Sequence, residues 1–255
     1  MDAIHVSIKA GVLTHWFGIP ITNTLLMSWV VVIVLVTFAF IMRSKLKLIP
    51  SKMQLLMEIL LEQILQFMEN TLESKVLAKR YFPLIVSLFL FIFIANLFEF
   101  IPGIGSIGVL ANEVNEAAGE HGTGFTPLLK SMNTDLNVTL ALSLISFLVI
   151  EISGIVMVGF FRYFSRFFNF QSPIMFFVGI IEFVSELIRL ISFSFRLFGN
   201  IFAGEVLLSV VVFFVPFIMP VPFMAFEVFV GFMQAAIFSL LTLFFLKLAV
   251  TEVTH

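Results

Sequence analysis

The sequence has no cysteine and little charge. Without cysteine the chain can form no disulfide, no thiolate zinc site and no iron–sulfur cluster. Charged residues make up 12% of the 255 residues, about half of the roughly 25% that is usual in soluble chains. The net charge of −2 provides no basic field for nucleic acid. These absences exclude a nucleic-acid-binding domain and any fold stabilised by disulfides or by cysteine-ligated metals.

Histidine is also scarce, and its positions do not suit a haem. The four histidines, His5, His15, His121 and His255, all lie outside the apolar stretches. We therefore expect no metal site and no cofactor. Residues 1–11 lack the basic region and the apolar core of a cleaved signal peptide, so we expect the N-terminus to remain on the mature protein.

Apolar side chains are what the sequence has in excess. Hydrophobic residues make up 60% of the chain, 35 residues are phenylalanine, and the mean hydropathy is +1.14. A water-soluble domain of this size has too little interior to bury so much apolar surface. The composition excludes an ordinary globular enzyme and a disordered chain, and it indicates a single-domain, all-α polytopic membrane protein.

Five apolar stretches are long enough to cross a bilayer; they are residues 21–42, 82–101, 137–161, 173–215 and 223–250. Residues 1–20 and 103–136 would form an external N-terminus and an external loop. The fourth stretch has 43 residues, or roughly 65 Å if helical, about twice a bilayer thickness. Its residues alone allow two spans with a hidden turn or one long tilted helix. Three prolines between 216 and 222 predict a hairpin into the last stretch.

Residues 51–76 predict an amphipathic helix. Ser51 and Gln54 have the spacing of a capping box. At about 100° per residue the apolar side chains share one side of the helix and the acidic ones the other. Four glutamates make a membrane span improbable, so we expect the helix at the membrane interface or packed on its neighbours. A helix that merely connects two spans on the soluble side remains the alternative.

The distribution of lysine and arginine predicts the orientation. The segments 43–80 and 162–172 contain nine basic residues, against Lys9 and Lys130 on the opposite side. The basic side should face the cytoplasm, with the N-terminus outside and the C-terminus inside. The two halves show no convincing internal repeat, which counts against an inverted-repeat transporter.

Ionisable and amide side chains interrupt the last two apolar stretches; they are Glu182, Glu186, Arg189, Arg196, Asn200, Glu205, Glu227 and Gln234. A charge at the bilayer centre costs about 2.5–3.5 kcal/mol, so such residues need partners, water or a function. On a helix the first five fall in a stripe roughly 80° wide. Glu186 and Arg189 have the spacing of a structural ion pair. Arg196 has no acid three or four residues away and needs a counter-ion from elsewhere, such as another chain.

Acids and amides in a row can pass protons, because a carboxyl group in a low dielectric can load and unload a proton near neutral pH. Arginine cannot give up its proton and acts as a fixed positive barrier. Acids on both stretches with Arg196 between them therefore suggest two proton paths separated by a charge.

The segment from Ser192 to Glu205, SFSFRLFGNIFAGE, resembles the signature of subunit a of F-type ATP synthases. Gln234–Phe238 (QAAIF) is similar to that family's second signature on the final helix. Shorter elements that resemble the family are Asn133–Thr139, Pro20–Trp29 and Asn96–Glu99 followed by Ile101 and Pro102. The likeness covers about residues 15–250. The RLFGN block is highly specific, and the others are moderately so.

The resemblance implies that Arg196 faces a ring of c subunits, attracts the ring carboxylate and blocks a short circuit between two half-channels. It implies that Asn200 and Gln234 are polar channel residues on facing helices, and that the two final stretches form a long tilted hairpin. The implied partners are the c ring and the peripheral stalk subunit b, with the stalk near residues 51–76. A bacterial inner membrane fits the N-terminus and the length of the chain, with an organelle membrane as the alternative.

The resemblance further implies that Glu205 and Glu227 line the access half-channel from outside, and that Ser192 and Glu182 lie toward the cytoplasmic exit. Some relatives pair an acid with a histidine at the positions of Glu205 and Glu227, whereas this chain has two glutamates. Two nearby acids can share a proton. No phosphate-binding glycine-rich loop is present, so we expect no ATP site and no catalysis by this chain alone.

Two other functions remain to be weighed. A secondary transporter would use Arg196 to bind an anionic substrate, and it predicts substrate-dependent flux in the purified chain. A structural membrane anchor would conduct nothing, and it predicts that replacing Glu205 and Glu227 by glutamine has no effect. The number of intramembrane acids argues against the anchor.

Overall fold

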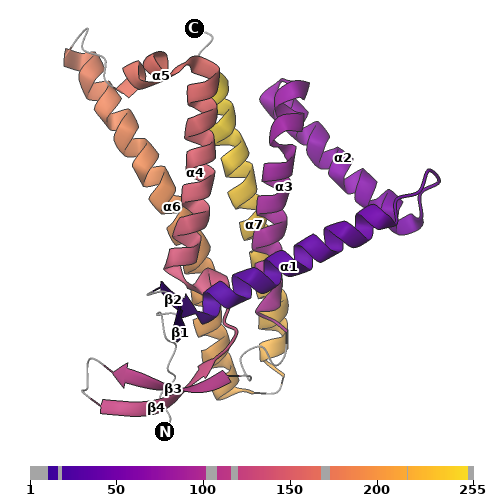
Figure 1. Ribbon diagram of the computed structural model, residues 1–255, viewed down its shortest axis with the longest axis vertical. Coiled ribbons are helices and arrows are strands. Elements are labelled where there is room, and N and C mark those ends of the chain that lie inside the picture. The colour runs from indigo at the N-terminus through magenta and orange to yellow at the C-terminus, as the bar shows by residue number, and fades with distance from the viewer. Residues whose placement is uncertain are drawn as a thin grey trace. The chain divides into compact units, whose positions relative to one another are not determined.

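The computed structural model describes residues 11–16, 19–101, 108–115, 120–167, 173–216 and 218–251. The expected termini at 1–10 and 252–255 lie outside the described residues. Helices dominate the described part (Figure 1), and the elements are β1 (Val12–Trp16), β2 (Ile19–Thr22), α1 (Asn23–Ser44), α2 (Lys52–Leu72), α3 (Lys75–Phe98), β3 (Gly108–Asn115), β4 (Glu120–Pro127), the 3-10 turn η1 (Met132–Thr134), α4 (Leu136–Val158), α5 (Phe160–Phe167), α6 (Pro173–Phe214) and α7 (Pro220–Thr251).

Five of these helices, α1, α3, α4, α6 and α7, are long and apolar enough to cross a membrane. This confirms the all-α polytopic membrane class. Only 11% of the apolar part of α6 is buried within the described chain, against 39% for α7. Helix α6 therefore presents most of its apolar side chains to lipid or to another protein.

The 43-residue apolar stretch forms one helix. Helix α6 runs from Pro173 to Phe214, 42 residues, without an internal break. Its three glycines do not interrupt the helix, and proline occurs only at its first residue, where it is tolerated. Helix α7 likewise begins with a proline, Pro220. The alternative of two spans with a hidden turn is therefore wrong.

The start of α2 shows one half of the expected capping box. Ser51 is the N-cap and its hydroxyl accepts a hydrogen bond from the backbone N–H of Gln54. The Gln54 side chain does not return to Ser51. It pairs with the backbone N–H and carbonyl of Lys47 at 3.2 and 3.1 Å, and so holds the connection between α1 and α2.

Helices α2 and α3 meet at Glu73, which has a positive φ of 53°. Helix α3 starts at Lys75, before the apolar stretch that begins at Phe82. The Lys247 ammonium on α7 binds the Glu73 carboxylate at 2.8 Å. This contact holds the pKa of Glu73 below its ordinary value, so the contact is present near neutral pH and is lost as the pH falls through that lowered value.

The segment between α3 and α4 contains an antiparallel hairpin of β3 and β4, which the sequence patterns did not predict. A second short hairpin, β1 with β2, precedes α1. The strands are too few to bury a sheet core, and both hairpins flank membrane helices.

The chain divides into two compact units, and each of the helices α1, α3, α4, α6 and α7 contributes residues to both. Unit 1 consists of residues 1–37, 90–138 and 197–234. Unit 2 consists of residues 38–89, 139–196 and 235–255. Unit 2 has an apolar cluster from α2, α3, α4 and α7, which includes Met68, Ile85, Ile150 and Leu243.

A close contact joins α4 to α5 within unit 2. Gly159 turns the chain between them with a φ of 91°. The Tyr163 hydroxyl donates to Glu151 at 2.8 Å, and the Tyr163 ring covers Gly154, where an added Cβ would lie 2.5 Å from Cε2. Gly154 therefore has no room for a side chain.

We expect Gly154→Ala to lower the stability of the purified chain by about 1 kcal/mol. The overpacking penalty of about 1–3 kcal/mol exceeds the helix preference for alanine, roughly 0.5–1 kcal/mol. The melting temperature should fall by roughly 2–4 °C in a thermal-shift measurement. Gly199→Ala is the control, because nothing lies within 4 Å of its added Cβ. An unchanged or higher melting temperature for Gly154→Ala would contradict the contact.

Candidate functional site

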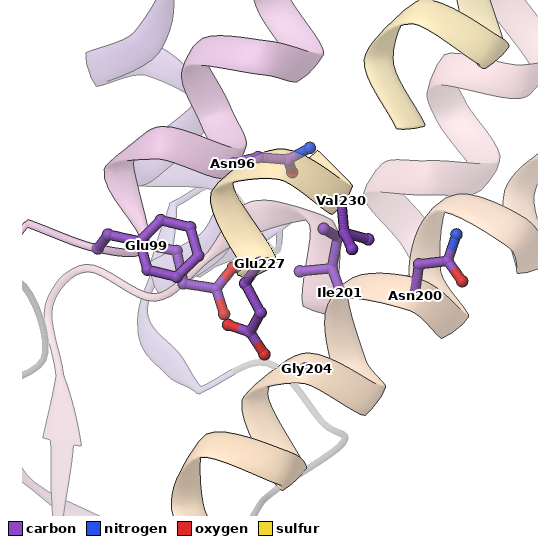
Figure 2. Close-up of a pocket in the computed structure, with 8 residues that line it drawn as sticks. Asn96, Glu99, Asn200, Ile201, Gly204, Glu227 and Val230 are labelled. Carbon is purple, nitrogen blue, oxygen red and sulfur yellow. The ribbon is translucent and has the colours of Figure 1, made fainter. Parts of the chain in front are cut away.

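Unit 1 contains a small cavity with a mixed polar and apolar lining at the end of α3, between α6 and α7 (Figure 2). Its volume of about 10 Å³ is close to what one water molecule requires. Its lining residues are Asn96, Glu99, Phe100, Asn200, Ile201, Gly204, Glu227 and Val230. The mixture of carboxyl, amide and apolar groups is typical of a site that holds a proton or a water, not a large organic ligand.

Helical spacing explains why these residues meet. Asn200, Ile201 and Gly204 lie on one face of α6, since residues three and four apart are neighbours on a helix. Glu227 and Val230 are three apart on α7 and face the same cavity. Figure 2 shows the side chains of Glu99 and Glu227 directed into one space beside Gly204.

Three carboxyl groups of unit 1 lie close enough to interact electrostatically: Glu99, Glu205 and Glu227. Glu99 accepts a hydrogen bond from the Ser131 hydroxyl at 3.1 Å. Glu227 is 9% exposed. One buried oxygen of Glu227 and one of Glu205 have no hydrogen-bond partner among the described residues. An ionised carboxylate is costly in such surroundings and a protonated one is not, so the cluster is suited to accepting and releasing protons.

No group of three or more histidine, aspartate or glutamate side chains within the described ranges is arranged to hold a metal ion.

The absence of a side chain at Gly204 leaves the space that the Glu227 carboxyl group occupies. A Cβ at position 204 would overlap Oε1 of Glu227. Glycine therefore allows the α7 carboxyl group to reach the surface of α6, and any larger residue would displace it.

Asn200 and Gln234 connect the same two helices. The Asn200 amide donates to the Gln234 side-chain oxygen at 2.7 Å, and Gln234 is 2% exposed. Four predicted site residues, Asn200, Glu205, Glu227 and Gln234, thus lie together in unit 1.

The other three predicted site residues lie on the part of α6 that belongs to unit 2. Arg196 and Ser192 are exposed, and Glu182 is half-buried. No hydrogen bond or ion pair joins Arg196 to any residue in the described part of the chain. Its guanidinium is therefore available to a group outside this chain.

Glu186 and Arg189, the expected structural pair, lie inside unit 2. Glu186 is 5% exposed. The Arg189 guanidinium lies 3.9 Å from the centroid of the Phe245 ring on α7. This cation–π contact gives Arg189 a packing role between α6 and α7.

Sequence reasoning did not place Asn96, Glu99 and Gly204 in the site. Asn96 and Glu99 give a detectable signal, because they are polar residues at the end of the apolar stretch 82–101. Gly204 lies within the signature segment Ser192–Glu205, but the sequence does not show why a glycine is needed there, because the side chain that requires the space belongs to Glu227, 23 positions away.

Comparison with known proteins identifies relatives over nearly the whole chain. Residues 25–247 match the family model described as ATP synthase A chain. The chain is 31% identical to ATP synthase subunit a of Moorella thermoacetica, over 90% of this chain and 91% of that one. It is 32% identical to ATP synthase subunit a of Campylobacter concisus, over 88% of each chain. The same identity is found with ATP synthase subunit a of Geobacter sulfurreducens, over 88% of this chain and 86% of that one.

We expect Gly204→Ala to reduce proton flux across vesicles that contain the protein together with its partner subunits by about a hundredfold, because moving a reacting group by about 1 Å has an effect of that order. The added methyl group would push the Glu227 carboxyl group out of its position. Combining it with Glu227→Asp, which shortens the side chain by one methylene, should restore part of the flux. Wild-type flux in Gly204→Ala would show that the position of Glu227 has no influence.

Proposed function

This chain belongs to the ATP synthase A chain family, and on that premise we propose that it is the proton-translocating stator subunit of a rotary F-type ATP synthase. The observation that carries this proposal is the cluster of Glu99, Glu205 and Glu227 beside the Asn200–Gln234 pair. The cluster offers several proton acceptors in an apolar bundle where each would otherwise be costly.

The cluster in unit 1 forms the entry path for protons in this proposal. A proton enters through Glu99 and Glu205 and is passed to Glu227 across the small cavity. A single water molecule there can bridge carboxyl groups that do not touch. The Asn200–Gln234 pair completes the polar surface between α6 and α7 and leads toward the rotor.

Arg196 is the fixed positive charge between entry and exit. It is exposed and unpaired within the described chain, which suits a residue that awaits a carboxylate on a ring of c subunits. Because an arginine keeps its proton at any physiological pH, protons cannot pass along it from one path to the other. Ser192 and Glu182 begin the exit path toward the cytoplasm.

In this proposal the other subunits of the complex supply the catalytic sites and the rotor. The chain acts as one component of ATP synthase and catalyses no step alone. Its partners are the c ring, along the exposed surface of α6, and the peripheral stalk subunit b, near α2. Helix α2 presents exposed apolar residues such as Met53, Leu56 and Leu60, which a stalk helix can cover.

The chain is a multi-pass membrane protein. We place it in a bacterial inner membrane with its N-terminus outside and its C-terminus in the cytoplasm, as the distribution of basic residues favours. The secondary-transporter alternative is not favoured, because the relatives over about 90% of the chain are ATP synthase subunits.

We expect Arg196→Ala to abolish ATP-driven acidification of vesicles that contain the assembled complex. Arg196→Lys should fail as well, because a desolvated lysine can lose its proton and no longer separates the two paths. ATP hydrolysis by the attached catalytic sector serves as the control for assembly and should remain detectable. Acidification equal to wild type in Arg196→Ala would refute the proposed function.

We expect Glu99→Gln to lower the same acidification by at least about tenfold, within the usual range for loss of a proton-transferring side chain. The amide keeps the size of the side chain and its acceptor for Ser131 but cannot carry the proton. Glu73→Gln is the matched control, because Glu73 is an exposed carboxylate in unit 2 and should have no effect. Equal rates for Glu99→Gln and Glu73→Gln would remove Glu99 from the path.

A further inference from the structure

Asn96 makes two hydrogen bonds inside unit 1 and is 2% exposed. Its side-chain amide donates to the backbone carbonyl of Gly231, in the middle of α7, at 3.0 Å. Its side-chain oxygen accepts from the Asn133 amide at 2.5 Å. Asn96 therefore links α3 both to α7 and to the segment that precedes α4.

The contact with α7 depends on the missing side chain of Gly231. A Cβ at position 231 would lie 3.0 Å from Cβ of Asn96, tighter than an ordinary packing contact. Glycine weakens a helix, so its use in mid-helix calls for a reason. The reason here is the close approach of α3, which lets a short asparagine reach the α7 backbone. An edge-on contact of Phe93 with Phe232 flanks the hydrogen bond.

Gly231 lies between the two site residues of α7. At about 100° per residue, Glu227 and Gln234 fall at roughly −40° and −60° from Gly231. All three therefore occupy one face of α7. The hydrogen bond to the Gly231 carbonyl therefore holds α7 against α3 at a point between Glu227 and Gln234.

Asn133 fixes which end of the Asn96 amide faces Gly231. Because Asn133 donates to the oxygen of Asn96, the nitrogen is left to donate to the carbonyl. Asn133 is itself fully buried in η1, and the flanking Asp135 accepts from Thr24 on α1 at 2.8 Å. The residues that orient Asn96 are thus anchored to α1.

We propose that Asn96 is a positioning residue for proton entry: its hydrogen bond to the Gly231 backbone sets the place of α7, so that Glu227 meets the cavity at Gly204 and Gln234 meets Asn200. This proposal rests on the proposed function and extends it. Asn96 need not carry a proton itself. It acts through the positions of Glu227, whose carboxyl group exchanges the proton, and of Gln234, which accepts the hydrogen bond from Asn200.

The test compares Asn96→Leu and Gly231→Ala with wild type in membranes that contain the whole complex. The first removes the hydrogen bonds and keeps the branching and the number of side-chain heavy atoms, and the second forces α3 and α7 apart. Each should lower ATP-driven proton flux by roughly three- to tenfold, the range that hydrogen bonds between membrane helices span. Ser87→Ala on α3 is the control, because its exposed hydroxyl bonds only its own helix and flux should stay at the wild-type level.

The pH profile of the flux separates positioning from a loss of folded protein. The ionisable groups that act on Glu227 are Glu205 on α6 and Glu99, which follows α3. Lys130 acts in turn on both of those acids. Moving Glu227 relative to these groups should shift the pH profile of the proton flux in both variants. ATP hydrolysis by the membrane-bound complex should stay at the wild-type level. A reduced flux that only follows a reduced amount of complex, with an unshifted profile, would overturn the proposal.

A double variant tests whether the two residues act through one contact. In an Asn96→Ala background, Gly231→Ala should lower the flux by less than it does alone, because the amide it displaces is already absent. Fully additive losses would overturn the proposal.

Arg196→Ala, measured in parallel, separates the positioning role of Asn96 from the proposed function. If it retains full flux, the proposed function fails. If it abolishes flux while Asn96→Leu and Gly231→Ala match Ser87→Ala, only the positioning role fails.

Discussion

The interior of unit 1 depends on the cost of placing polar groups in an apolar bundle. At the bilayer centre a single charge costs about 2.5–3.5 kcal/mol, so each polar side chain must find a partner. Amides meet this demand by bonding to one another and to the backbone, as in the Asn96–Gly231 and Asn200–Gln234 contacts. One buried carboxyl oxygen of Glu227 has no such partner within the part of the chain that the structure describes, and an unpaired carboxyl group of this kind can exchange a proton.

Three glycines make the close contacts that this arrangement needs. Gly154 admits the Tyr163 ring in unit 2, and in unit 1 Gly204 and Gly231 admit side chains from neighbouring helices. Small residues allow membrane helices to approach closely, because packing replaces the hydrophobic effect as the driving force between them. Gly204 lines the cavity, and Gly231 contacts Asn96, another residue of its lining, so the spacing of the helices and the geometry of the site depend on the same contacts.

The length and apolar character of the membrane helices could be predicted from composition, since a bilayer demands about 20 apolar residues per span. The stripe on α6 could be predicted as well, but its surroundings could not. Glu186 of the stripe is buried, whereas Arg196 and Asn200 are exposed, because the neighbours of a 42-residue helix change along its length. The Asn96 and Glu99 contacts were missed because they join α3 to segments at least 30 residues away.

The sequence by itself determined the membrane class, the candidate proton-carrying residues and the resemblance to a family, because hydropathy, charge and short motifs are local properties of a chain. Only the tertiary structure decided that the 43-residue stretch is one helix and that Glu99 joins Glu205 and Glu227. It also showed that the missing side chains of Gly204 and Gly231 leave the space that Glu227 and Asn96 occupy. The physical reason is that a buried polar group is stabilised by partners that lie close in space, and the number of residues between two positions does not indicate whether they are in contact.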